Sequence, residues 1–119
     1  MSWNLFLDDE RHLSDPYWMP HEIRALYRDE PWVIIRSGFD AQDYIKEHGF
    51  PTRVSFDHDL GDRMPTGMDI GKWLIELDLD EGGMPDNFEF FVHSMNPVGA
   101  QNITALLTNY LKTKNKNGN

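Results

Sequence analysis

Four short apolar runs, each followed by polar residues and separated by helical patterns, constrain the fold of this chain most strongly. The runs lie at residues 3–7, 32–37, 53–56 and 88–92. Between the third and fourth runs, apolar side chains recur with helical spacing at Ile70, Trp73, Leu74 and Leu77. Strands that alternate with helices indicate βαβ units. The sequence therefore predicts an α/β fold in which a parallel sheet of about four strands carries helices on both faces.

Local signals mark the helix boundaries. A short helix is expected over residues 21–29, and a second over residues 40–48 that ends at Gly49. Thr66 and Asp69 resemble a capping box at the start of the third helix.

The last helix is expected to begin at Asn96, a good N-cap residue, with Pro97 in its first turn. The polar residues 113–119 are expected to form a flexible tail. With 119 residues and no long linker, the rest of the chain is expected to form a single domain over residues 1–112.

Composition excludes several classes of function. The net charge is −9, from 11 basic and 20 acidic side chains, which argues against an extended nucleic-acid surface or binding to an anionic membrane. The chain has no cysteine, so it has no thiol nucleophile and no cysteine-based zinc site. No segment approaches the roughly 18 apolar residues of a membrane span, and no leader is legible at the N-terminus. A cytoplasmic location is expected.

Acidic residues gather where the first and third runs end. Asp8 and Asp9 follow the first run, and Asp57 and Asp59 follow the third. If the two strands are parallel neighbours, these carboxylates meet at one edge of the sheet and repel one another. A divalent cation would offset that repulsion, and oxygen ligands suit Mg²⁺ or Mn²⁺. The alternative is that these are solvated loop residues or helix caps.

A second polar group follows the fourth run. The start of the last helix, beside Asn96, could bind an anion through its backbone N–H groups, and Ser94 could donate its hydroxyl to a phosphate. Arg11 could reach the same phosphate or pair with the nearby acids. Turn formation and capping explain Ser94 and Asn96 equally well. His58 and His93 are candidates for acid–base chemistry, although a histidine beside apolar residues is often structural. If Ser94 faces the site, alternation along the strand would turn His93 into the layer below.

The strings "LFLDDER", "VSFDHDLG" and "VHSMNPVG" together resemble response-regulator receiver domains, and more closely their divergent branch, the cyclic-phosphate processing receiver domains. The resemblance covers about residues 3–111. It implies a flavodoxin-like sheet in the order 2-1-3-4. It also implies that Asp8 and Asp9 form the acidic pair, that Asp57 ligates Mg²⁺ and accepts phosphate in the parent family, and that Ser94 occupies the hydroxyl position after strand four.

The chain departs from receiver domains at its C-terminal end. Receivers carry a lysine after a fifth strand, but here the last helix follows strand four, and Lys112, Lys114 and Lys116 lie in or beyond that helix. Strand four is therefore expected at the sheet edge, where a homo-oligomer could form.

These features lead to one main hypothesis and two alternatives. The main one is metal-dependent hydrolysis of a cyclic phosphate on an RNA end or a nucleotide. The alternatives are a module that binds phosphate, nucleotide or protein without catalysis, and a phosphoacceptor signalling receiver. The candidate catalytic residues are Asp57, His58 and His93. The candidate phosphate ligands are Ser94, Asn96 and Arg11. The candidate ligands for Mg²⁺ or Mn²⁺ are Asp8, Asp9, Asp57 and Asp59.

Overall fold

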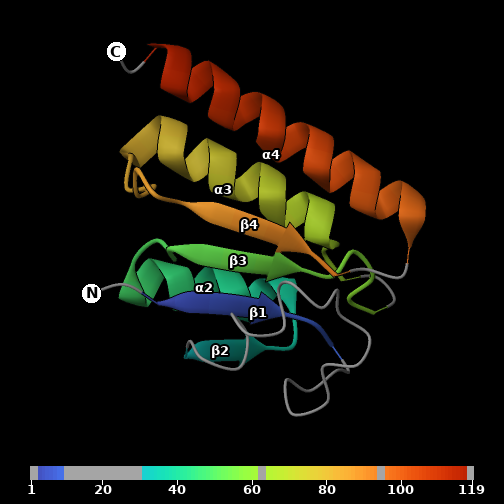
Figure 1. The fold of residues 1–119 in the computed structure, drawn as a ribbon. Helices are drawn as coiled ribbons and strands as arrows, with labels where there is room; N and C mark the ends of the chain where they lie inside the picture. The colour runs from blue at the N-terminus through green and yellow to red at the C-terminus, as the bar shows by residue number, and fades with distance from the viewer. Residues whose placement is uncertain (1–2, 10–30, 62–63, 94–95, 118–119) are drawn as a thin grey trace.

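The computed structural model describes residues 3–9, 31–61, 64–93 and 96–117. Within them, four parallel strands form one sheet in the order β2-β1-β3-β4, as predicted (Figure 1). The strands are β1 (Asn4–Leu7), β2 (Trp32–Ile35), β3 (Arg53–Phe56) and β4 (Glu89–Val92). β4 is an edge strand of this described sheet. The helix expected over residues 21–29 lies outside the described residues.

The register of the sheet brings the residues that follow the strands into one row. The last residues of the strands are paired across the sheet in the order Ile35, Leu7, Phe56 and Val92. The backbone N–H groups of Asp8, Asp57 and His93 extend the ladder by one step, donating to strand-end carbonyls at 3.2, 2.9 and 2.9 Å. Arg36 occupies the corresponding position after β2. Four charged or titratable residues therefore lie in one row across the end of the sheet, in the order Arg36, Asp8, Asp57 and His93.

The three described helices share one core with one face of the sheet. They are α2 (Gly38–His48), α3 (Gly67–Glu81) and α4 (Pro97–Asn117). Their buried side chains form a cluster with strand residues of a single face, among them Leu5, Leu7, Val54 and Phe56. Phe6 and Ser55 are also fully buried but belong to the opposite face, since strand side chains alternate. No helix in the described ranges is both long enough and apolar enough to cross a membrane.

Capping explains where α2 begins and ends. α2 begins at Gly38, two residues before the predicted start, because Ser37 acts as its N-cap and accepts a hydrogen bond from the Asp40 N–H at 3.1 Å. It ends as predicted at Gly49, whose φ of 95° lies in the region that favours glycine. The Gly49 N–H donates to the Ile45 carbonyl at 2.8 Å.

α3 begins with the predicted capping box, whose two hydrogen bonds between Thr66 and Asp69 measure 3.2 and 2.9 Å. α4 differs from its prediction at the other end, because it continues to Asn117 and includes most of the segment expected to be a flexible tail. Side chains near that end are held by α3: the Tyr110 hydroxyl and the Lys114 ammonium both donate to Asp78 Oδ2, each at 2.6 Å.

Candidate functional site

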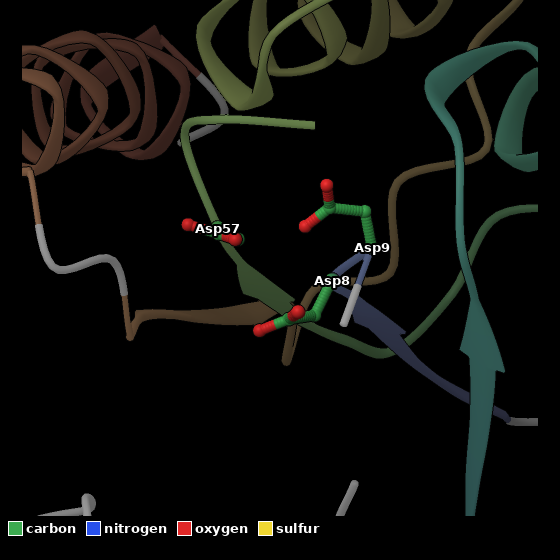
Figure 2. Close-up of side chains that lie close together, drawn as sticks. All are labelled: Asp8, Asp9 and Asp57. Atoms are coloured by element: carbon green, nitrogen blue, oxygen red, sulfur yellow. The ribbon is translucent and has the colours of Figure 1, made fainter. Parts of the chain in front are cut away.

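Three carboxylates meet at the carboxyl edge of the sheet. One oxygen from each of Asp8, Asp9 and Asp57 lies within 4.8 Å of the others. Figure 2 shows the three side chains around a common space, two from the end of β1 and one from the end of β3. Asp8 is 1% exposed and Asp57 is 9% exposed, while Asp9 is half-buried. Neighbouring strands in register produce this convergence, and such a set of hard oxygen donors fits Mg²⁺ or Mn²⁺.

Asp59, the fourth predicted metal ligand, is not among these three carboxylates. Its Oδ1 lies 2.9 Å from His58 Nδ1, and its Oδ2 accepts a hydrogen bond of 3.5 Å from the Asn96 side-chain amide. The structure therefore places Asp59 beside His58, where its carboxylate can orient the imidazole.

His58 lies between the strand end and the first turn of α4. Its ring packs against Gly99, where a Cβ atom would come within 2.4 Å of His58 Cγ. Asn96 caps α4 as predicted, with its Oδ1 accepting from the Gly99 N–H at 2.9 Å, and its amide nitrogen lies 3.4 Å from His58 Nδ1. The His58 side chain is 21% exposed. Because Nδ1 faces Asp59, Nε2 is the nitrogen placed to exchange a proton with a ligand.

His93 has different surroundings. Its side chain is 1% exposed, with Nε2 3.0 Å from Asp8 Oδ2 and Nδ1 2.6 Å from Ser55 Oγ. Its ring stacks on Phe6, with 4.5 Å between centroids and 4° between planes. Both ring nitrogens are thus engaged inside the protein. This geometry favours the structural alternative for His93 over proton transfer to a ligand.

Arg36 is a site residue that the sequence analysis missed. Its Nη1 donates to the Asp8 carbonyl at 3.0 Å, so a guanidinium group lies beside the acidic cluster. A cation there offsets part of the repulsion among the carboxylates. The sequence analysis placed Arg36 inside the second run, at residues 32–37, but β2 ends at Ile35. Arg36 therefore follows its strand as Asp8, Asp57 and His93 follow theirs.

The predicted phosphate ligands are only partly described. Ser94 and Arg11 lie outside the described residues. At the start of α4, Asn96 accepts from the N–H groups of Gly99 and Ala100, through its side chain and its carbonyl. Proline at position 97 has no N–H, so within the first four helical residues Val98 is left to offer a backbone donor to an anion.

Solved structures with a similar fold can be compared with this chain. The chain resembles the N-terminal domain of a response regulator/sensory box/GGDEF 3-domain protein from Carboxydothermus hydrogenoformans, with a TM-score of 0.53 and 13% identity, over 99% of this chain and 100% of that one. A response regulator receiver domain (CheY-like) from Methylobacillus flagellatus matches with a TM-score of 0.48 and 16% identity, over 92% and 98% of the two chains. At 13% identity, the first of these likenesses shows the fold alone.

A family model gives a more specific result. No curated protein matches this sequence. The model described as the cyclic-phosphate processing receiver domain matches residues 3–109, which include all the site residues described above. The chain therefore belongs to the cyclic-phosphate processing receiver domain family.

Proposed function

We propose that this protein hydrolyses a cyclic phosphate, such as a 2′,3′-cyclic phosphate on an RNA end or a nucleotide, with the help of a divalent cation. The observation that carries the proposal is the convergence of three carboxylates within 4.8 Å. His58, held by Asp59, follows Asp57 directly at the same end of the sheet. The name of the family agrees with this class of substrate.

Asp8, Asp9 and Asp57 would hold the cation. When bound, Mg²⁺ or Mn²⁺ supplies Lewis acidity, which polarises a phosphoryl oxygen and makes a bound water more acidic. The carboxylates by themselves repel an anionic substrate. We therefore expect the affinity for a cyclic phosphate to depend on the divalent cation.

His58 would move the proton. Asp59 accepts a hydrogen bond from Nδ1–H, which leaves the lone pair on Nε2. Nε2 would take a proton from the water whose oxygen bonds to phosphorus. The bond from phosphorus to one ribose oxygen would then break, that oxygen would take a proton from solvent to become a hydroxyl, and Nε2 would release its proton to solvent. Val98 N–H, Ser94 and Arg11 would bind the non-bridging oxygens.

The direct test is hydrolysis of 2′,3′-cyclic nucleotides with Mn²⁺, with Mg²⁺ and with a chelator. We expect turnover that requires the cation and falls by about 10²–10⁴-fold in His58→Ala, the usual contribution of acid–base catalysis. Cation-dependent binding of the cyclic nucleotide in calorimetry, with no turnover, would instead assign the non-catalytic binding module. If neither turnover nor binding is observed, both functions are excluded.

A pair of glycine variants isolates the position of His58. Gly99→Ala puts a methyl group into the imidazole, whereas in Gly71→Ala the nearest side-chain atom, Leu106 Cδ2, is 3.5 Å away, an ordinary contact. We expect Gly99→Ala to lower kcat at least about tenfold with unchanged Mn²⁺ affinity, because it moves the proton-transfer group and no cation ligand. Gly71→Ala should retain wild-type kcat. Equal kcat values for the two variants would argue against His58.

A further inference from the structure

Asp8 and His93 touch although their strands are not neighbours. β3 lies between β1 and β4 in the sheet, yet His93 Nε2 reaches Asp8 Oδ2 at 3.0 Å. The imidazole therefore spans β3 on the face that carries Ser55, and Ser55 Oγ lies 2.6 Å from Nδ1. Asp8 and His93, which follow β1 and β4, are thus joined with Ser55 of β3 in one chain of hydrogen bonds.

The direction of these hydrogen bonds follows from the groups involved. A carboxylate only accepts, so His93 Nε2 carries the hydrogen and donates it to Asp8. In the neutral ring Nδ1 then accepts, and the hydroxyl of Ser55 donates to it. The Phe6 ring, nearly parallel to the imidazole, fixes its plane. The hydrogen bonds to Asp8 and Ser55 and the stacking on Phe6 hold the His93 ring in this orientation.

We propose that His93, held by Ser55, is a positioning residue that fixes the carboxylate of Asp8 for cation binding. The hydrogen bond to Oδ2 restrains rotation of the carboxylate and so fixes the direction in which Asp8 presents its oxygens to a cation. Groups behind a metal ligand typically change metal affinity by 10–100-fold when they are removed. The inference rests on the proposed function only in that Asp8 binds the cation; it does not require turnover.

The competing explanation is a buried hydrogen bond that stabilises the fold and nothing else. The two explanations differ in what happens to cation affinity. The positioning role requires that affinity falls when the hydrogen bond to Asp8 is lost, even at temperatures where the variant is fully folded. A purely structural role lowers the melting temperature and leaves affinity unchanged.

The test is Mn²⁺ binding by calorimetry to the full chain, together with melting temperatures measured without metal. His93→Phe keeps a ring against Phe6 and removes both hydrogen bonds, and we expect it to weaken Mn²⁺ binding by about 10–100-fold. His93→Gln retains an N–H donor that can reach Asp8 and should recover part of that loss. Ser55→Ala removes the hydrogen bond that supports the ring and leaves the one from His93 to Asp8, so its loss should be smaller than that of His93→Phe. It also provides a milder variant if His93→Phe does not fold.

Tyr110→Phe is the matched control, since it also deletes one hydrogen bond to a buried aspartate, Asp78, on the helical layer. It should lower the melting temperature with no change in Mn²⁺ affinity. Wild-type affinity in Ser55→Ala and in any folded His93 variant would overturn the positioning role while leaving the cation site in place. Absence of Mn²⁺ binding to the wild type at millimolar concentration would overturn both. Weakened binding in the His93 variants of a protein that shows no turnover would support the positioning role and remove only the hydrolase.

Discussion

Asp78 in α3 is shielded from water, as are Asp8 and Asp57 among the three carboxylates at the strand ends, but the neighbours of the two regions differ. The Asp78 side chain is 5% exposed and accepts three hydrogen bonds, from Tyr110, Lys114 and the Met84 N–H. The nearest charges to Asp9 and Asp57 include each other and Asp8, all within 4.8 Å. The region around Asp78 surrounds a carboxylate with hydrogen-bond donors. The strand-end region places three negative charges close together.

The pKa values of the first region express this match. Burial by itself raises the pKa of Asp78, but the hydrogen bonds from Lys114, Tyr110 and Met84, with the charge of Lys114, outweigh burial and hold that pKa below its ordinary value. Burial and the hydrogen bond to Asp78 raise the pKa of Tyr110 to about 12. A carboxylate with such partners contributes to stability. A cluster of carboxylates opposes folding until a cation joins it, which is the mark of a binding site.

The largest effect that would test this contrast is stabilisation by metal. Mn²⁺ at a hundred times its dissociation constant should add about 2.7 kcal/mol to the free energy of unfolding, because it binds the folded state alone. Asp9→Asn and Asp57→Asn should lose most of that increment. Without metal they should melt as high as the wild type or higher, since each removes a repelling charge. Calorimetric melts with and without Mn²⁺ measure both effects, and equal increments in all three proteins would end the contrast.

Asp78→Ala should have the opposite profile. We expect it to lower the free energy of unfolding by about 1–3 kcal/mol, because Lys114 and Tyr110 lose a buried partner. The increment given by Mn²⁺ should be unchanged. Asp80→Ala, at an exposed position of the same helix, is the control and should cost little. A change in Mn²⁺ affinity in Asp78→Ala would show that the two regions are coupled.

The pH dependence of stability is a smaller test of the same contrast. The folded pKa of Asp78 is depressed, so its contribution is present above the unfolded pKa of about 3.9 and is lost as pH falls through the lower folded pKa. Denaturant unfolding between neutral and acidic pH should therefore show a loss in the wild type that is reduced in Asp78→Asn. Parallel curves for the two proteins would contradict the assignment.

At alkaline pH, stability is expected to fall as pH rises, the opposite of its behaviour at acidic pH. Tyr110 has a raised folded pKa, so its contribution is present below about pH 10 and is lost as pH rises through about 12. Tyr110→Phe should remove this contribution to the loss of stability at high pH, and the variant should remain folded at neutral pH.

The smallest expected effect is the absence of a stable phosphoaspartate. Lys114, one of the lysines near the C-terminus, is held by Asp78 and does not serve the strand-end site. Intact-mass spectra after incubation with acetyl phosphate should therefore show no long-lived adduct. Stoichiometric modification that disappears in Asp57→Asn would restore the signalling hypothesis and make the acidic cluster a phosphoacceptor site.

Much of the fold could be predicted because its signals are local. Each strand is an apolar run with a polar end, and the capping residues Thr66 and Asn96 stand where the helices begin. The earlier start of α2 was missed because Gly38 is a poor helix former. Ser37 caps the helix there, and close packing explains the glycine that follows it, because a Cβ atom at Gly38 would come within 2.9 Å of Ile70 Cδ1 in α3. Sequence patterns do not record such a contact.

The site was predictable to the extent that its residues follow strands. Asp8, Asp9 and Asp57 could be grouped from their position, given parallel neighbours in register. Ser55 could not be assigned to the site from the sequence, because it lies inside a strand and its partner, His93, is 38 residues away. The pairing of Asp59 with His58 was equally hidden, since two adjacent residues can point to one ligand or to each other.

The contact between Asp8 and His93 also has a consequence for how the chain folds. These residues are 85 positions apart in the sequence. Closing so long a loop carries an entropic cost that local helices do not meet, so contacts of this kind form late. An intermediate in which β1 and β3 have paired but β4 has not docked would already hold all three carboxylates, without the imidazole behind Asp8. We expect such an intermediate to bind the cation weakly and the protein to reach full affinity only after β4 has docked. The rate at which Mn²⁺ affinity increases during refolding would then report the rate of this last step.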